Sequence, residues 1–188
     1  MKRSTFLQIL CLIVLASCLG LRAQGADPEI VMKTSLGSIT IQLDPKDAPI
    51  TTANFLTYVD QKKLDGTIFH RVIPGFMVQG GGFKPDMTEI AYLPPIKNEA
   101  NNGLKNLRGT ISMARTSDPD SATSQFFLNL VDNAMLDPND QSAGYAVFGK
   151  IVKGLDVIDA IAKVETTTVG QNENVPVKPV MIISVRRK

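Results

Sequence analysis

The segment from 67 to 73 places an arginine among apolar side chains. It reads Thr-Ile-Phe-His-Arg-Val-Ile, and the alternation of a β-strand would put Arg71 on one face with Phe69 and Ile73. An arginine beside apolar groups keeps its charge and its fork of donors while it loses part of its hydration, which strengthens the hydrogen bonds that it makes. We therefore expect Arg71 to donate to a ligand. The alternative is an arginine that extends into solvent or pairs with a carboxylate.

Two further strand-like segments combine amide and apolar side chains in the same way. In Gln125-Phe-Phe-Leu-Asn the amide of Gln125 shares a face with Phe127, and in Phe76-Met-Val-Gln the side chains of Met77 and Gln79 share a face. An apolar surface with a few polar groups is the usual composition of a ligand pocket. Together the three segments predict such a pocket, although each by itself could belong to the core or to a solvent-facing surface.

Several chemistries are excluded by the residues that the chain lacks. It has one histidine, His70, and two cysteines, Cys11 and Cys18. A zinc site of clustered His and Cys, a Cys–His nucleophilic pair and a disulfide framework are therefore not expected, and we predict no metal site. The acidic turns at 118–120 and 137–140 do not continue into a calcium-binding loop with its closing glutamate.

Two partial motifs do not carry the functions that they suggest. The run from Gly144 to Lys150 has the spacing of a phosphate-binding loop, but Ile151 follows where a magnesium-binding Ser or Thr is required, and the run is strand-like. A serine hydrolase would have to use His70, yet no Gly-x-Ser-x-Gly turn is present to hold the serine.

The first 25 residues have the pattern of a secretory signal peptide. Lys2 and Arg3 precede an apolar run from 6 to 15, which is too short to cross a bilayer core of roughly 30 Å. Cleavage before Ala26 would give a periplasmic protein. The residues Leu-Ala-Ser-Cys at 15–18 also resemble the lipobox of bacterial lipoproteins, so a protein anchored in the cell envelope through a lipid on Cys18 is the alternative. We expect contact with a membrane only in that second case.

The charge of the chain gives no reason to expect a nucleic-acid partner. The full chain has 20 basic and 18 acidic residues, but the predicted signal peptide contains three of the basic residues and none of the acidic ones. The mature chain would then carry 17 basic and 18 acidic residues. Without a basic surface there is little electrostatic attraction for a phosphate backbone.

The mature chain, 26–188, is predicted to be one domain because it has no repeat and no linker-like tract. A hairpin is expected from Glu29 to Leu43 around Gly37, a helix from Ala48 to Lys62 with Pro49 at its start, and a second helix from Leu155 to Lys163. Further short strands are expected at 67–73, 76–79, 110–115, 125–130, 146–152 and 180–186. This order favours an antiparallel sandwich or barrel, and the irregular stretch from 80 to 109 is expected to form functional loops.

The residues that form these segments resemble a known family. The thirteen residues from Phe69 to Gly81 are similar to the signature of the cyclophilins, the peptidyl-prolyl cis/trans isomerases. Three further blocks follow in the family's order at 112–115, 124–127 and 147–150, and the resemblance covers residues 29 to 187. Met-Ala-Arg-Thr at 113–116 and Gly-Tyr-Ala-Val-Phe-Gly at 144–149 resemble the exported bacterial branch.

This resemblance implies a mostly β fold, a closed eight-stranded antiparallel barrel capped by two α-helices. It implies an enzyme that accelerates rotation about Xaa-Pro bonds in exported proteins and assists their folding without a cofactor. The expected partners are proline-containing unfolded or flexible polypeptides, and the protein is expected to be a monomer. A module that binds such chains without isomerising them is the alternative function.

The resemblance also implies a role for individual residues on the outer surface of the barrel. The catalytic residues would be Arg71, Gln79 and Phe76. The substrate-binding residues would be His70, Ile73, Met77, Ala114, Arg115, Gln125, Phe127, Met135, Leu136 and Tyr145. Among these, Phe76, Met77 and Phe127 would hold the proline ring, with Leu136 at the rim, and Ala114, Arg115 and Gln125 would hold the residues before the proline.

Two positions differ from the eukaryotic members of that family. Met135 stands where many of them have a tryptophan that donates a hydrogen bond to cyclosporin, and this chain has no tryptophan. We therefore expect weak cyclosporin binding. Tyr145 stands in place of a histidine near the pocket, so an aromatic contact is retained there.

Overall fold

A computed structural model describes residues 27–188. The predicted signal peptide, with Cys11, Cys18 and both predicted cleavage sites, lies outside the described residues. Within them the chain forms ten strands, two α-helices and two short 3₁₀ turns. No helix of the described range is long and apolar enough to span a membrane.

The first hairpin forms as its sequence predicts. Strand β1 (Glu29–Thr34) pairs with β2 (Gly37–Leu43), and Thr34 lies opposite Gly37. Gly37 has φ +140, a value that side-chain-bearing residues rarely adopt, and a Cβ atom there would lie 2.7 Å from Cγ2 of Val157. Glycine at this position therefore allows the hairpin to approach the second helix closely.

Helix α2 (Pro49–Asp60) begins at Pro49 as predicted and ends two residues before the predicted Lys62. The carboxylate of Glu99 accepts hydrogen bonds from the backbone N–H groups of Ile50 and Thr51, at 3.0 and 2.7 Å. It thus satisfies donors that the first turn of a helix leaves free. The ring of Phe55 lies 5.6 and 5.2 Å from those of Phe126 and Phe148, which anchors the helix on the barrel core.

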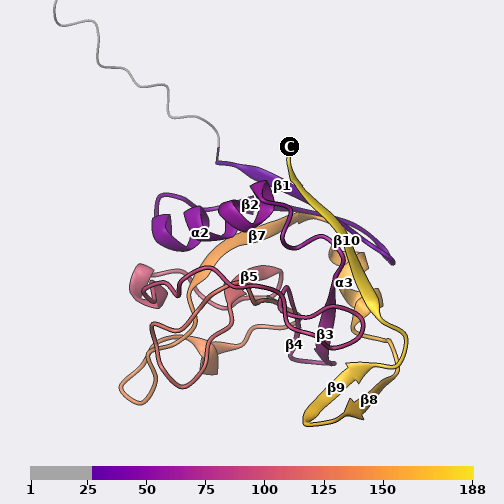
Figure 1. Ribbon diagram of the computed structural model, residues 1–188. Coiled ribbons are helices and arrows are strands. Elements are labelled where there is room, and N and C mark those ends of the chain that lie inside the picture. Colours follow the sequence, from indigo (N-terminus) through magenta and orange to yellow (C-terminus); the bar gives the residue numbers. More distant parts are fainter. Residues whose placement is uncertain (1–26) are drawn as a thin grey trace, which may run out of the picture.

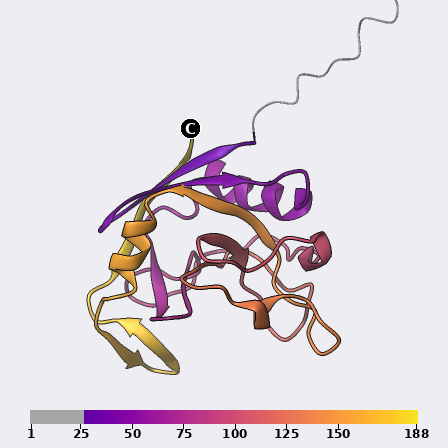
Figure 2. The ribbon, with the colours of Figure 1, turned by 180° about the vertical axis from the view of Figure 1, so that it is seen from behind.

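Helix α3 (Leu155–Ile161) is also shorter than the predicted 155–163. It buries Val157, Ile158 and Ile161 in the same hydrophobic core that α2 contacts. In Figures 1 and 2 the two helices lie apart, against different parts of the barrel.

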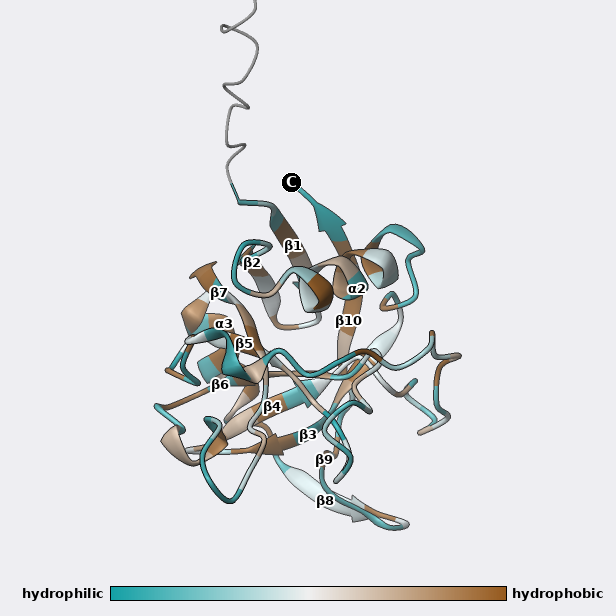
Figure 3. Ribbon diagram, turned by 90° about the vertical axis from the view of Figure 1, so that its left-hand side faces the viewer, coloured by the Kyte–Doolittle hydropathy of each residue, from teal (hydrophilic) through white to brown (hydrophobic). Residues whose placement is uncertain are grey.

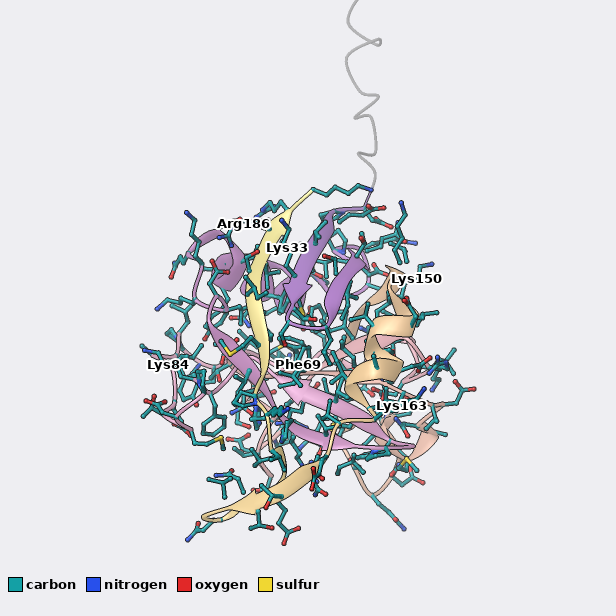
Figure 4. The ribbon with its side chains drawn as sticks, turned by 90° about the vertical axis from the view of Figure 1, so that its right-hand side faces the viewer. Lys33, Phe69, Lys84, Lys150, Lys163 and Arg186 are labelled. Atoms are coloured by element: carbon teal, nitrogen blue, oxygen red, sulfur yellow. The ribbon has the colours of Figure 1, made fainter. Side chains whose placement is uncertain are left out.

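The remaining barrel strands are β3 (Thr67–Ile73), β4 (Met77–Gly80), β5 (Thr110–Met113), β6 (Phe126–Asn129), β7 (Val147–Lys153) and β10 (Val180–Arg187). With β1 and β2 they form a closed antiparallel barrel in the order β1-β10-β3-β4-β6-β5-β7-β2. The eight-stranded barrel with two α-helices is confirmed. The barrel strands carry most of the hydrophobic colour in Figure 3. In Figure 4 Phe69 lies within the barrel, whereas Lys84 and Lys150 lie at the periphery of the molecule.

One element of regular structure was not predicted. Strands β8 (Thr166–Val169) and β9 (Asn172–Pro176) form a two-stranded hairpin outside the barrel, between the predicted second helix and the predicted last strand. The hairpin projects from the end of the barrel that carries β3 and β4 (Figure 1). The stretch from 80 to 109 is irregular, as expected, and includes the short 3₁₀ turn η2 (Ala100–Asn102).

Candidate active site

Arg71 lies immediately after an irregularity in β3. Phe69 pairs with Gly80 and Arg71 with Gln79, so β3 uses two residues where β4 uses one. Such a bulge changes the alternation of the strand. Phe69 is fully buried in the core, while Arg71 is exposed. The prediction that these two side chains share a face is therefore wrong, and Arg71 keeps its contact with solvent in the free protein.

The exposed Arg71 lines a surface cavity of about 490 Å³. Its walls come from β3, β4, the loops near 83, 115 and 125, and the β8–β9 hairpin: His70, Arg71, Gln79, Phe83, Arg115, Gln125, Gln171, Asn172 and Glu173. No carboxylate of the described residues lies within 4 Å of the Arg71 guanidinium. The guanidinium is thus available to a ligand rather than held in an ion pair.

A second cavity, of about 380 Å³, adjoins the first. Both are lined by Gln79, Arg115 and Gln125. The other residues of the second cavity are Glu89, Tyr92, Ala114, Thr116, Ser121 and Thr123. The two cavities share these three lining residues, and we refer to them together as the groove.

Two glutamines stand where the cavities meet. Nε2 of Gln79 donates to Oε1 of Gln125 at 2.8 Å. This bond fixes both amides, and it leaves Oε1 of Gln79 and Nε2 of Gln125 with capacity for further hydrogen bonds. The pair can therefore offer one acceptor and one donor to a peptide backbone in the groove.

Apolar side chains continue the same wall beyond the glutamines. Phe127 lies opposite Gln79 in the β4–β6 ladder and is 4% exposed, while Met77 is 2% exposed. The ring of Phe127 packs edge-on against Tyr145 at 5.7 Å, and the N–H of Tyr145 donates to the carbonyl of Leu136. Phe126 and Leu128, on the other face of β6, belong to the hydrophobic core, whereas Phe127 does not. The outer wall thus joins an apolar surface to a row of polar groups.

Arg115 closes one side of this surface and is held by three contacts. Its guanidinium lies 4.5 Å from the centre of the Tyr145 ring, Nε donates to the carbonyl of Gly144, and an NH group donates to the carbonyl of Thr116. Stacking on an aromatic face and carbonyl acceptors suit a planar guanidinium. Arg115 is therefore positioned by the protein, in contrast to the free Arg71.

The comparisons with known proteins decide the family. Residues 29–187 match the family model described as cyclophilin type peptidyl-prolyl cis-trans isomerase/CLD. This chain belongs to the cyclophilins. It is similar to peptidyl-prolyl cis-trans isomerase A of Dickeya dadantii, with 57% identity over 164 residues that cover 87% of this chain and 86% of that protein.

Other relatives agree with that assignment. An Acinetobacter baylyi peptidyl-prolyl cis-trans isomerase is 58% identical over 163 residues, which cover 87% of each chain. The crystal structure of a Cryptosporidium parvum cyclophilin in the presence of the dipeptide Ala-Pro superposes with a TM-score of 0.73 at 26% identity, covering 85% of this chain and 98% of that one. The chain is a peptidyl-prolyl cis-trans isomerase.

His70 borders the groove of this cyclophilin as a buried neutral group. Burial, and secondly the positive charge of Arg71, lower the pKa of His70 to about 4. Its ring packs against Phe83 at 4.6 Å, and its Nδ1 atom has no hydrogen-bond partner among the described residues. At neutral pH His70 therefore adds no second positive charge beside Arg71.

A buried network of asparagines supports the apolar end of the groove. Nδ2 of Asn133 donates to Oδ1 of Asn129 at 2.7 Å and to the carbonyl of Phe76 at 2.9 Å. Asn129 in turn donates to Thr110. Both asparagines are almost fully buried, where unpaired amides would be costly. The network ties the segment before η3 (Ala134–Leu136) to Phe76, the residue that precedes β4.

The structure brings most of the predicted site residues together, with exceptions at the apolar end. Arg71, Gln79, Ala114, Arg115, Gln125 and His70 line the groove. Phe127, Met77, Tyr145 and Leu136 line neither cavity; Phe127 lies opposite the groove residue Gln79 in the β4–β6 ladder, and Tyr145 packs against Phe127 and Arg115. Met135 is 67% exposed and also lines neither cavity. Ile73 and the partly exposed Phe76 also line neither cavity. Ile73 lies opposite Met77 in the β3–β4 ladder, and the carbonyl of Phe76 accepts a hydrogen bond from the asparagine network.

Sequence reasoning missed several residues of the groove. Phe83, Glu89 and Tyr92 come from the irregular stretch that follows β4, and Gln171 to Glu173 come from the unpredicted hairpin. No periodic pattern marks either segment. The Gly170-Gln171 turn between β-prone residues was the available signal for the hairpin. In residues 27–188 no group of three His, Cys, Asp or Glu side chains could hold a metal ion.

Proposed function

We propose that this cyclophilin acts on proline-containing segments of exported proteins and assists their folding, and that Arg71 is its catalytic donor. The observation that carries the proposal is the position of Arg71. Its unpaired guanidinium shares one cavity with the Gln79–Gln125 pair, and Gln79 lies opposite Phe127 on the same outer wall. A proline ring against Phe127 and Met77 would therefore place its peptide bond within the polar part of the groove.

This arrangement suits rotation about a peptide bond. The barrier of roughly 18–20 kcal/mol arises because twisting removes amide resonance. In the twisted state the proline nitrogen becomes pyramidal and regains its lone pair. A donor directed at that nitrogen binds the twisted state better than the planar one, and only such differential binding accelerates the reaction. An arginine side chain suits this role because its planar guanidinium is a rigid fork of charged donors.

The required stabilisation is within reach of a few directed hydrogen bonds. Turnover on the order of 10³ s⁻¹ corresponds to a barrier near 13 kcal/mol, so the site must supply about 5–7 kcal/mol of differential stabilisation. The apolar wall would hold the ring while the carbonyl before the proline rotates. The amides of Gln79 and Gln125 would hold the backbone on either side.

The proposed location follows from the N-terminal sequence. A basic start, an apolar run and small residues are typical of a signal peptide, and both cysteines of the chain lie within the first 18 residues. A mature chain without cysteine suits an oxidising compartment, and peptide-bond rotation requires no ATP. Exported chains pass through that compartment unfolded, and so with their proline bonds accessible.

The test uses Arg71→Ala and a matched control, Arg187→Ala. Arg187 is an exposed arginine of β10 that pairs with Asp60 outside the groove. Isomerisation of a short proline peptide is measured by NMR exchange, with circular dichroism to verify the fold. Arg71→Ala is expected to lose at least 100-fold in kcat/KM, whereas Arg187→Ala keeps the wild-type value. Activity of Arg71→Ala within threefold of wild type contradicts the role of Arg71.

A refolding experiment separates isomerisation from simple binding. The substrate is a secreted protein whose slow refolding phase is limited by a proline bond. Wild type is expected to accelerate this phase and Arg71→Ala is not. If Arg71→Ala improves the refolded yield as much as wild type does, the protein acts as a binding module instead.

A further inference from the structure

The β8–β9 hairpin contributes one wall of the cavity that contains Arg71. Val169 pairs with Asn172, so Gly170 and Gln171 form a two-residue turn, and Gly170 has φ +60. Positive φ at the first central residue is typical of tight hairpin turns that match the twist of the strands. The hairpin projects from the barrel (Figure 1), and its strand β8 is pale in Figure 3.

A bulge in β9 sets the direction of the residues beside that turn. Thr167 pairs with Val175 and Val169 with Asn172, so β9 contains one more residue than β8 over this interval. The extra residue lies next to Asn174, which has φ +59, in the left-handed region. Bulges of this kind redirect side chains next to functional sites. Here the three consecutive residues Gln171, Asn172 and Glu173 all line the cavity.

Glu173 is the one acidic side chain among the described residues that line this cavity. It is exposed, and no basic group of the described residues lies within 4 Å of its carboxylate. The cavity also contains Arg71 and Arg115. Arg115 is engaged by Tyr145 and by two backbone carbonyls. The carboxylate of Glu173 is therefore a free charge on the rim of a groove that binds peptides.

We propose that Glu173 is a specificity-determining residue that recognises a lysine or arginine of the substrate close to the proline. A flexible basic side chain can reach the rim carboxylate while the peptide bond itself lies at Arg71. The charge of Arg71 opposes this contact, but a charge pair at hydrogen-bond distance outweighs a repulsion that acts across solvent over a longer distance. The inference rests on the isomerase activity of the groove and adds a substrate class to it.

The size of the effect follows from the exposure of the carboxylate. Exposed charge pairs contribute little, and screening by salt weakens them further. We expect a preference of about threefold to fivefold in kcat/KM at low ionic strength, equal to about 0.6–1 kcal/mol. The preference should decrease in about 0.5 M salt, where the Debye length is only a few ångströms.

The experiment compares proline peptides that differ at one position. An alanine-based peptide carries Lys, Gln or Glu at each of the two positions before and the two positions after the proline. For each enzyme the readout is the ratio of kcat/KM for the Lys peptide to that for the Gln peptide. Because a general loss of activity cancels in this ratio, a failure of isomerisation and a failure of recognition are distinguishable.

Wild type is expected to give a ratio of 3–5 at one position, Glu173→Gln a ratio near 1, and Glu173→Lys a preference for the Glu peptide at that same position. Glu165→Gln is the matched control, because Glu165 is an exposed acid on the same connection that lines neither cavity. It should keep the wild-type ratio. A wild-type ratio near 1 at every position, or an unchanged ratio in Glu173→Gln, overturns the proposal.

Discussion

Arg71 and His70 are neighbours in the sequence but lie in very different environments. His70 is 5% exposed, whereas Arg71 reaches solvent in the groove. Since the pKa of His70 is lowered to about 4, chiefly by burial, the histidine is neutral through the physiological range. Of this pair only the arginine carries charge, so the field in the groove does not change with the titration of His70 above pH 5.

The lowered pKa of His70 predicts a pH dependence of stability. Below pH 6.5 the unfolded chain binds a proton at this histidine, while the folded chain resists it until about pH 4. The folded state is thus destabilised as pH falls through this window, by about 3 kcal/mol in total. Urea unfolding at pH values from 7 to 4 measures this loss of stability. Because His70 stays neutral above pH 6, kcat/KM should be constant from pH 6 to pH 8.5.

A His70→Gln variant provides the control, because other groups also contribute at low pH. Arg187 and Arg186 lower the pKa values of Asp60 and Asp65, whose stabilising contribution is lost as these carboxylates are protonated. In His70→Gln the loss of unfolding free energy that comes from the carboxylates should remain. The loss between pH 6.5 and pH 4 that comes from the histidine should be absent. If the unfolding free energy of the two proteins falls equally steeply between pH 6.5 and pH 4, the assignment of this loss to His70 is contradicted.

Met135 predicts weak cyclosporin binding that one substitution can strengthen. It lies on η3 and is 67% exposed, next to Leu136 at the end of the apolar wall. The methionine side chain has no hydrogen-bond donor, whereas the indole N–H of a tryptophan at this position could donate a hydrogen bond to the drug. Met135→Trp should raise cyclosporin affinity at least tenfold by isothermal titration. An unchanged affinity means that the exposed side chain does not reach the bound drug.

At the scale of elements, Gly37 illustrates how the hairpin and α3 depend on one residue. Gly37→Ala adds an unfavourable φ and a Cβ atom 2.7 Å from buried Val157, so it should cost about 2–3 kcal/mol of unfolding free energy. Gly66 has φ +75 with no atom within 4 Å of the added Cβ, so Gly66→Ala should cost only about 1 kcal/mol. Denaturant unfolding measures the loss of unfolding free energy in both variants. Equal losses would contradict the close approach of the hairpin to α3.

The elements also show which features the sequence could predict. The first hairpin, both helices and every barrel strand were predicted to within a few residues, because each has an apolar period or a Pro or Gly at its boundary. The bulge at His70 was not predicted, because it depends on the register in which β3 pairs with β4, and the sequence of β3 alone does not specify that register. The β8–β9 hairpin was missed since its threonines and asparagines have no apolar period.

The same distinction applies to the groove. Arg71, Gln79 and Gln125 were found because polar residues within β-prone runs are conspicuous. The cavity residues Glu89, Tyr92 and Glu173 lie on irregular or polar segments, and only the closed barrel brings them near β3 and β4. Contacts between distant segments of this kind follow from topology, which no local pattern contains.

At the scale of the whole molecule, the two ends of the described chain meet in the barrel. Strand β10 lies between β1 and β3, so closure requires the last strand of the chain. Three ion pairs fasten it: Arg186 with Asp65, Arg187 with Asp60, and Lys188 with Glu29. Because these ion pairs are exposed, each contributes little to stability. The main restraint on β10 is its hydrogen-bonded pairing with β1 and β3.

Every barrel strand lies within residues 29–187, after the predicted cleavage site before Ala26. Expression of the full chain in a bacterium with a working secretion pathway should give an intact mass that corresponds to residues 26–188. Cleavage before Cys18 with added acyl mass, and release from membranes only by detergent, would instead support the lipid-anchored alternative. A mass of the full 188 residues contradicts export by either route.

The most direct test of the account separates binding from rotation at Arg71. NMR line shapes of a proline peptide, titrated with wild type and with Arg71→Ala, give the Kd and the cis–trans exchange rate on the enzyme. Because Arg71 is proposed to favour the twisted state, the exchange rate should fall at least 100-fold while Kd changes by less than threefold. An exchange rate that is unchanged, or a loss confined to Kd, would show that Arg71 only holds the substrate.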